Sequence, residues 1–210
     1  MDFIRGVLKR HAPSRIKRSL WDEEFSSSKW NFIDNTAGDC VYLYLQKYLG
    51  GGNILDLGCG PGNTANELEE SAYRVYVGVD ISEAALAKAR KRTAECGRTN
   101  KNLFLQGDFL SYVPGSKFDV ILFRESMYHV PLGKVKAVLD RYSQYLTDTG
   151  VFVVRMATSD TQGNTKYRPA AMIGVMETEF DVFEKVQHGE GGPTVIVFQP
   201  KHVPIVASVN

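Results

Sequence analysis

Residues 54–63 of the chain read ILDLGCGPGN, a short apolar run that passes into a turn with three glycines. Such a run followed by glycines is typical of a buried strand that turns directly into a helix. Glycine at the turn permits a positive φ angle and lets backbone N–H groups approach a ligand closely. The stretch therefore predicts a strand, a tight turn and a helix. The turn is expected to bind a ligand, with a turn needed only for packing as the alternative.

The rest of the chain continues this alternation. The Ala-rich residues 81–96 predict a helix with Ser82 as its N-cap. Residues 118–123 are apolar apart from Asp119, as in a strand buried on both faces. Strands are expected at Asn53–Leu57, Arg74–Val79, Leu103–Gln106, Phe118–Phe123, Gly150–Met156, Phe180–Gln187 and Thr194–Gln199, and helices at Asn63–Glu70, Ile81–Cys96, Val135–Leu146 and Tyr167–Glu177. The pattern predicts an α/β fold: a doubly wound, mostly parallel seven-stranded sheet with an antiparallel strand from a C-terminal hairpin.

An acid at the end of the second expected strand narrows the ligand class. Asp80 lies twenty residues after Gly60, where a carboxylate can accept hydrogen bonds from both ribose hydroxyls of an adenosine ligand. A dinucleotide fingerprint expects Gly or Ala where this chain has Asn63, and Asp56 would repel a pyrophosphate. S-adenosylmethionine has no phosphate, and its sulfonium and ammonium groups suit Asp56.

Residues 53–156 resemble the core of the class I S-adenosylmethionine-dependent methyltransferases, in particular the small-molecule branch with a generic methyltransferase domain. The resemblance rests on ILDLGCGPGNTA, VGVDISEAALAKAR, LQGDFL and FDVILFRESMYHV, in this order. It implies a Rossmann-like methyltransferase fold and S-adenosylmethionine as cofactor, with S-adenosylhomocysteine as product. One departure is LTDTG, residues 146–150, where the family usually has a Pro-Gly-Gly turn at the end of the strands opposite the cofactor.

The resemblance also implies roles for single residues. It places Asp108 near the adenine amine, and Ile81 and Phe109 against the adenine ring. From the residues alone, Asp80 could instead stabilise a helix N-terminus and Asp108 could cap a loop. The predicted cofactor-binding residues are Asp56, Gly58, Gly60, Asn63, Asp80, Ile81, Asp108, Phe109 and Arg124.

The segment after the fourth expected strand, Arg124–His129, is where the resemblance places acceptor chemistry. It reads RESMYH, without the Asn/Asp-Pro-Pro-aromatic tetrad or the Pro-Cys pair of nucleic-acid methyltransferases. His129 is the candidate catalytic base, with a pKa expected near about 6–7, and a structural hydrogen bond is its alternative role. Tyr128 is a second catalytic candidate. Glu125 and Trp30 are candidates for contacting the substrate, Trp30 as part of a lid, although packing of Trp30 on the core is equally compatible with the pattern.

Composition limits the remaining possibilities. The chain has 210 residues, with 25 Lys and Arg against 24 Asp and Glu, and a net charge of +1. This balance counts against nucleic acid as a partner. Three cysteines at unrelated spacings indicate neither a disulfide framework nor a metal site, so no metal is expected. No apolar run is long enough to span a membrane and the N-terminus lacks the apolar core of a secretory signal, so a cytoplasmic location is expected.

The N-terminal region has its own character. Residues 2–20 contain six basic residues and one acid, with apolar residues at helical spacing. This predicts a docked, solvated first helix, with a membrane-surface helix or a transit peptide as alternatives. Residues 1–40 are expected to form a helical lid or leader, and residues 41–210 the S-adenosylmethionine-dependent methyltransferase domain.

These patterns together predict an enzyme that transfers a methyl group from S-adenosylmethionine to an oxygen or nitrogen of a small-molecule acceptor by in-line displacement. Two alternatives remain at this point. One is an NAD(P)-dependent oxidoreductase on a related sheet, and the other is a non-catalytic adenosyl-binding domain. No feature of the sequence indicates an oligomeric state.

Overall fold

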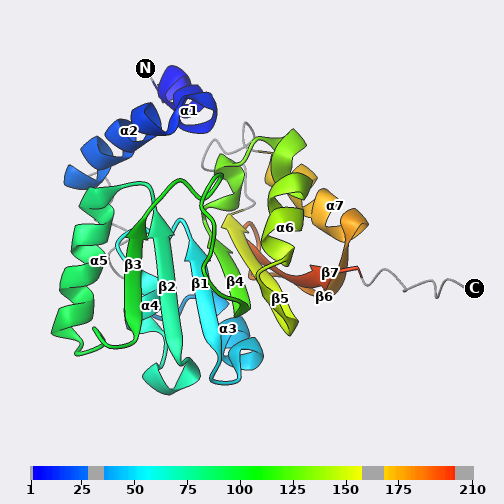
Figure 1. Ribbon diagram of the computed structural model, residues 1–210. Helices are drawn as coiled ribbons and strands as arrows, with labels where there is room; N and C mark the ends of the chain where they lie inside the picture. Colours follow the sequence, from blue (N-terminus) through cyan, green and yellow to red (C-terminus); the bar gives the residue numbers. More distant parts are fainter. Residues whose placement is uncertain (1, 28–35, 158–167, 202–210) are drawn as a thin grey trace, which may run out of the picture.

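The computed structural model describes residues 2–27, 36–157 and 168–201, which contain one seven-stranded sheet (Figure 1). The strands lie in the order β3-β2-β1-β4-β5-β7-β6. Strands β1 to β5 are parallel, whereas β7 pairs antiparallel with both β5 and β6. The predicted sheet with one antiparallel strand is therefore confirmed. Its strands are β1 (Asn53–Leu57), β2 (Val75–Asp80), β3 (Asn102–Gln106), β4 (Phe118–Arg124), β5 (Leu146–Ala157), β6 (Phe180–Gln187) and β7 (Pro193–Pro200).

Helices cover both faces of the sheet, as a parallel sheet with apolar residues on both sides requires. On one face, α3, α4 and α5 pack with Ile54 and Tyr76. On the other face, α6 and α7 pack with Leu55 and Val77, because successive side chains of a strand point in opposite directions. The bounds of these helices are α3 (Val41–Leu49), α4 (Asn63–Glu67), α5 (Glu83–Glu95), α6 (Val135–Ser143) and α7 (Pro169–Glu179).

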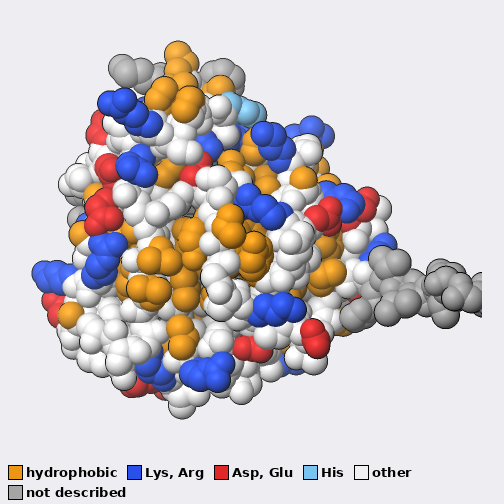
Figure 2. All heavy atoms as spheres, in the orientation of Figure 1, with side chains coloured by type: hydrophobic (Ala, Val, Ile, Leu, Met, Phe, Trp, Pro, Cys, Tyr) orange, Lys and Arg blue, Asp and Glu red, His pale blue; other side chains and the backbone are white. Residues whose placement is uncertain are grey.

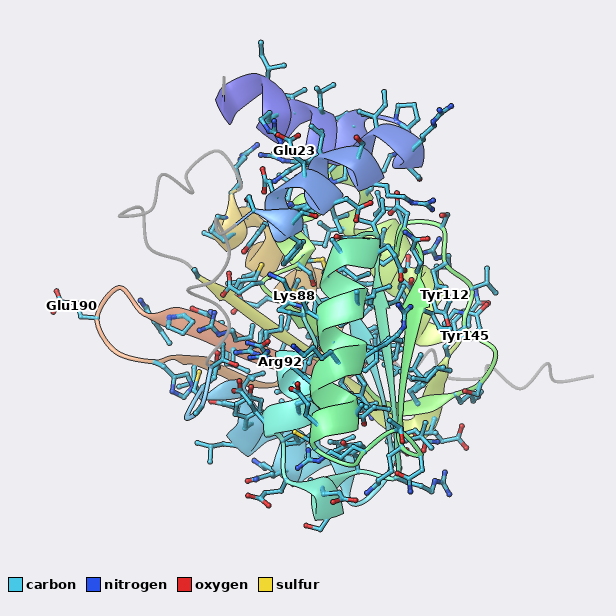
Figure 3. All side chains as sticks on the ribbon, turned by 90° about the vertical axis from the view of Figure 1, so that its left-hand side faces the viewer. Glu23, Lys88, Arg92, Tyr112, Tyr145 and Glu190 are labelled. Carbon is cyan, nitrogen blue, oxygen red and sulfur yellow. The ribbon has the colours of Figure 1, made fainter. Side chains whose placement is uncertain are left out.

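The first two helices, α1 (Asp2–His11) and α2 (Ser14–Ser26), lie beyond the carboxyl ends of the parallel strands (Figure 1). Asp22 on α2 ties them to the start of α5: its Oδ1 accepts hydrogen bonds from Ser82 Oγ at 2.8 Å and from the Ala84 N–H at 3.1 Å. Figure 3 shows this side of the molecule, with α5 toward the viewer and Glu23 of α2 above it. The N-terminal helices thus cover the end of the sheet at which α/β folds bind ligands.

The element boundaries differ from the expected ones at helix ends and at β5, which begins at Leu146 and not at the expected Gly150. Helix α4 ends at Glu67 because Leu68 adopts an extended conformation, and α6 ends at Ser143, three residues before β5 begins. The prediction of Ser82 as N-cap is confirmed, since its Oγ accepts the Ala85 N–H at 3.2 Å. The LTDTG stretch forms the beginning of β5, at the end of the sheet away from the glycine turn.

Within the part of the chain that the structure describes, no helix combines the length and apolar character needed to cross a membrane.

Candidate active site

The three glycines after β1 form a tight turn in which each has a positive φ, +84° at Gly58, +52° at Gly60 and +74° at Gly62. A Cβ atom on Gly58 would lie 2.6 Å from the Cβ of Ser126, and one on Gly62 would lie 2.7 Å from the Cβ of Ala89. Packing therefore requires glycine at both positions. A Cβ on Gly60 would meet only one side-chain atom, 3.8 Å away, so the backbone at Gly60 faces open space.

Gly60 and Gly62 should respond differently to substitution by alanine. Both carry the strain of a positive φ, but only the change at position 62 adds a steric clash. We expect Gly62→Ala to lower the free energy of unfolding by about 1–2 kcal/mol more than Gly60→Ala does. Gly60→Ala should cost more free energy of S-adenosylmethionine binding than free energy of unfolding. Urea unfolding and titration calorimetry measure the two effects, and equal behaviour of the two variants would mean that the loop serves packing alone.

A cavity of about 980 Å³ lies at the carboxyl ends of the strands, bounded by the glycine turn, α1 and α2. Its size suits a cofactor together with a second small molecule. Trp30 lies outside the described residues. The cavity is lined by all of the predicted cofactor-binding residues and by the other three predicted site residues: Asp56, Gly58, Gly60, Asn63, Asp80, Ile81, Asp108, Phe109, Arg124, Glu125, Tyr128 and His129.

Two buried carboxyl groups line the cavity from β1 and β2. Asp80 accepts the Gly60 N–H at Oδ2 and the Ser82 N–H at Oδ1, both at 2.8 Å. It therefore holds the glycine turn and keeps a lone pair on each oxygen for a ligand. Asp56 accepts the Tyr76 hydroxyl at Oδ2, at 2.6 Å, while its buried Oδ1 has no hydrogen-bond partner among the described residues. Burial raises the pKa of both carboxyl groups to about 6, and a buried unpaired carboxylate oxygen suits a cationic ligand group.

The third predicted acid, Asp108, is bonded to α2. Its Oδ2 accepts hydrogen bonds from Ser14 Oγ at 2.9 Å and Lys17 Nζ at 3.0 Å, and its Oδ1 accepts the Leu110 N–H at 3.0 Å. The burial of Asp108 favours its neutral form, but the Leu110 N–H and Lys17 outweigh this and lower the pKa of the carboxyl group below its usual value. Asp108 thus anchors the N-terminal helices over the cavity, and Oδ1 retains one lone pair.

A cluster of ion pairs joins the ends of β4 and β5 in the cavity wall. Arg124 Nη2 donates to Asp39 Oδ2 at 2.8 Å, and Arg155 Nη2 lies 3.2 Å from the same oxygen. Arg155 Nη1 also donates to Glu125, whose second oxygen accepts the Tyr128 hydroxyl at 2.8 Å. The cluster therefore fixes Glu125 and Tyr128, and it places Arg124 in an ion pair with Asp39.

Several charged residues that line the cavity were not predicted as site residues, among them Lys17, Asp39 and Arg155. Arg155 could have been found, because it is the single charged residue in the otherwise apolar stretch 151–156. Lys17 and Asp39 stand in no recognisable motif. Glu125 has a φ of +53°, which is uncommon for a residue other than glycine and is found most often at functional sites. Among the described residues, no group of three or more His, Cys, Asp or Glu side chains is arranged to hold a metal ion.

His129 lies on a 3₁₀ turn, Met127–His129, between two aromatic rings. Its ring centroid is 5.0 Å from that of Trp21 and 4.9 Å from that of Tyr128, both edge-on. Desolvation, assisted by the positive charges of Lys9 and Arg10, lowers the pKa of His129 to about 3. The pKa near 6–7 expected from the sequence is therefore wrong. The imidazole is neutral at pH 7, as a proton acceptor must be, but it does not titrate in the physiological range.

The lowered pKa of His129 should make the protein less stable in acid. The unfolded imidazole binds a proton below about pH 6.5, whereas the folded one stays neutral down to about pH 3. This contribution to stability is complete above pH 6.5 and is lost as the pH falls toward 3. When the pH falls from about 7 to about 5, the free energy of unfolding of wild type should therefore decrease by about 1–2 kcal/mol more than that of His129→Gln.

Urea unfolding of both proteins at both pH values measures this difference. The raised pKa values of Asp56 and Asp80 affect both proteins alike and cancel in the comparison. An equal acid loss in wild type and variant would show that His129 is solvated in the folded state.

Comparison with known proteins identifies methyltransferases of several kinds. The chain is 30% identical over 116 residues to the mRNA cap guanine-N(7) methyltransferase of Schizosaccharomyces pombe, a match that covers 51% of this chain and 32% of that protein. It is 25% identical over 119 residues to the 27-O-demethylrifamycin SV methyltransferase of Amycolatopsis mediterranei, covering 53% of this chain and 44% of that protein. The chain thus spans less than half the length of these curated relatives.

Structural and family comparisons cover more of the chain. The N-methyltransferase NodS from Bradyrhizobium japonicum WM9, solved in complex with S-adenosyl-L-homocysteine, has a TM-score of 0.69 and 17% sequence identity, over 88% of this chain and 98% of that one. At this identity the likeness shows a shared fold. A family profile described as a methyltransferase domain matches residues 28–187, well over half of the chain. With this match, the strand order and the glycine turn, the chain belongs to the class I S-adenosylmethionine-dependent methyltransferase family.

Proposed function

We propose that this protein transfers a methyl group from S-adenosylmethionine to an oxygen or nitrogen atom of a small-molecule acceptor. The observation that carries the proposal is the pair of buried acids beside the glycine turn, Asp80 bonded to the turn and Asp56 with an unpaired oxygen. A nucleoside with cationic groups is complementary to this pair. A dinucleotide is not, because its pyrophosphate would lie near the charge of Asp56.

The residues present fit the cofactor along its length. Asp80 would accept hydrogen bonds from the ribose hydroxyls through the remaining lone pairs of its two oxygens. The unpaired Oδ1 of Asp56 would accept the ammonium group. Ile81 and Phe109 would lie against the adenine ring, and the remaining lone pair on Asp108 Oδ1 would accept the adenine amine.

The other predicted cofactor residues would act mainly through shape and charge. The backbone at Gly60 would line the cofactor where a Cβ atom would face open space, and Gly58 would keep the turn packed closely against Ser126. Asn63 Oδ1 accepts a hydrogen bond from Arg92 at 2.5 Å, so Asn63 would position the start of α4. Arg124 would act from within its ion pair with Asp39, as a positioning residue of the cavity wall.

S-adenosylmethionine supplies a methyl group on a sulfonium, whose neutral thioether leaves without help from the protein. The residues of the chain would hold the acceptor in line, exclude water and accept a proton. Neutral His129, walled by Trp21 and Tyr128, would take the proton of an acceptor hydroxyl. Tyr128, held through its hydroxyl by Glu125, would orient the acceptor.

A small molecule is proposed as the acceptor in preference to a nucleic acid. The names of the relatives include an enzyme of the mRNA cap and an enzyme of an antibiotic, so they support both classes. The net charge of +1 gives no electrostatic support to a polyanion. Trp21 and Phe25 of α2 line the cavity, which favours a compact acceptor enclosed with the cofactor. A cytoplasmic location remains part of the proposal.

In the proposed domain organisation, residues 1–40 form a lid and residues 41–210 form the catalytic domain. Two contacts support it: Lys17 bonds to Asp108, and Asp22 bonds to Ser82 at the start of α5. Both contacts join the N-terminal helices to loops that line the cofactor end of the cavity. The lid would keep water from the cofactor during methyl transfer.

Titration calorimetry with S-adenosylmethionine, S-adenosylhomocysteine and NAD tests the cofactor assignment. Binding of the first two compounds and no binding of NAD are expected, and the reverse result would overturn the proposal. Release of S-adenosylhomocysteine is then followed across a panel of hydroxyl and amine acceptors. Binding of S-adenosylmethionine with no turnover across the panel would favour a non-catalytic adenosyl-binding domain.

A further inference from the structure

The N-terminal helices α1 and α2 bury charged side chains and expose apolar ones. Lys17 and Glu24 are only 7% and 4% exposed, whereas Ile4, Val7 and Ile16 are 65%, 43% and 44% exposed. A surface helix of a globular protein ordinarily turns its apolar stripe to the core and its charges to water. Both helices therefore present apolar residues to the outside in a way that packing on the sheet domain does not explain.

The acids of α2 all have partners within the protein. Glu23 lies 3.0 Å from Arg5, and Glu24 lies 2.5 Å from Lys9. Asp22 is bonded to the start of α5. Asp22 and Glu24 are therefore neutralised or capped within the protein, whereas the side chain of Glu23 is 67% exposed and lies on the surface beside Arg5. Residues 2–26 contain six Lys and Arg against four Asp and Glu, so the two helices keep a net positive charge.

The outward side of the two helices combines apolar residues with cations. Ile4 and Val7 are three residues apart, so they lie on one face of α1. On α2, Arg15, Ile16 and Arg18 are exposed. Around the helix Arg15 lies between the other two, with Ile16 on one edge of the exposed side and Arg18 on the other. Figure 2 shows hydrophobic side chains gathered with Lys and Arg over this part of the molecule. We call Ile4, Val7, Arg15, Ile16 and Arg18 the outer face.

We propose that the outer face docks the protein on an anionic phospholipid bilayer. Apolar side chains beside cations are what a helix needs to lie at the boundary between lipid headgroups and acyl chains, where the cations meet anionic headgroups. The opposite side of α1 contributes Arg5, Gly6 and Lys9 to the cavity wall. Docking would therefore bring one wall of the cavity against the membrane surface.

Flotation of the full chain with vesicles tests this proposal. Vesicles of phosphatidylcholine with phosphatidylglycerol should bind at least about tenfold more protein than vesicles of phosphatidylcholine alone, and added salt should release the protein. Ile4→Asp combined with Val7→Asp should abolish binding. Arg15→Glu combined with Arg18→Glu should weaken binding to anionic vesicles by about fivefold or more for each changed residue.

Val113→Asp is the matched control, because Val113 is 67% exposed but belongs to the segment between β3 and β4 and not to α1 or α2. This variant should bind vesicles as wild type does. Thermal unfolding and calorimetric binding of S-adenosylmethionine show whether each variant is folded. Since none of the outer-face residues lines the cavity, cofactor binding should be unchanged in all of them.

Three results would overturn membrane docking. The first is equal binding to neutral and anionic vesicles, and the second is binding that survives the double substitution of Ile4 and Val7. The third is no binding to anionic vesicles; a dimer in sedimentation that the same substitution dissociates would then assign the outer face to a second copy of the chain. Cofactor binding is measured separately, so none of these results bears on the proposed methyl transfer.

Discussion

Asp80→Ala should weaken binding of S-adenosylmethionine by about 10- to 100-fold. The proposed hydrogen bonds between the ionised carboxylate and the ribose hydroxyls would be lost. The N–H groups of Gly60 and Ser82 would also lose their acceptor, so the glycine turn would be held less firmly. Titration calorimetry gives the dissociation constant, and thermal unfolding shows that the variant is folded.

Asp119→Ala is a matched control for the Asp80 experiment. Asp119 on β4 also accepts two hydrogen bonds, from the Asn53 N–H at 2.7 Å and from Thr147 Oγ1 at 3.1 Å, but it is not among the residues that line the cavity. Its substitution should lower stability and leave the dissociation constant nearly unchanged. If Asp80→Ala folds and binds S-adenosylmethionine as tightly as wild type, Asp80 has no part in the binding site.

His129→Ala should lower kcat on a hydroxyl acceptor by about 10²-fold, the lower end of the usual effect of losing a general base, because a pKa of about 3 makes the imidazole a weak base. The dissociation constant of S-adenosylmethionine should change little, because His129 is proposed to contact the acceptor. Since the pKa of His129 is lowered to about 3, its own titration should not reduce the wild-type rate between about pH 5 and pH 8. An amine acceptor would add an acid limb of its own, and the variant would keep that limb.

The Tyr128→Phe variant distinguishes the orientation of the acceptor by Tyr128 from the proton transfer to His129. It removes the hydroxyl that Glu125 accepts but keeps the ring beside His129. We expect this variant to raise KM and to lower kcat less than His129→Ala does. A His129→Ala variant with full activity and an unchanged pH profile would leave alignment of the substrates as the only source of catalysis.

The fold can be predicted from the sequence because its signals are local. The glycine turn of residues 58–62 and the N-cap at Ser82 depend on neighbours only a few residues away. The apolar run from Val120 to Phe123 predicts a buried strand for the same reason. The hairpin around residues 188–192 predicts an antiparallel pair, and the observed β6 and β7 confirm it.

Site residues can be predicted from the sequence only where they lie close to these local motifs. Asp56 and Asp80 are close to the glycine turn in the structure because β1 and β2 are neighbours in the sheet. Asp108 and Lys17 are 91 residues apart in sequence, and no periodic pattern says that α2 packs over the loop after β3. The pKa of His129 cannot be predicted from the sequence either, because it depends on burial beneath α2 and on charges carried by α1.

The position of β7 between β5 and β6 has a consequence for synthesis of the chain. The outer edge of β5 pairs with β7, yet 43 residues separate the end of β5 from the end of β7. At about 5–20 residues per second, a ribosome needs about 2–9 s to make them. During that time the edge of a buried apolar strand is open to pairing with other nascent chains. A chain cut short before Pro193 would carry this edge permanently, so truncated products should be prone to aggregate and to be degraded.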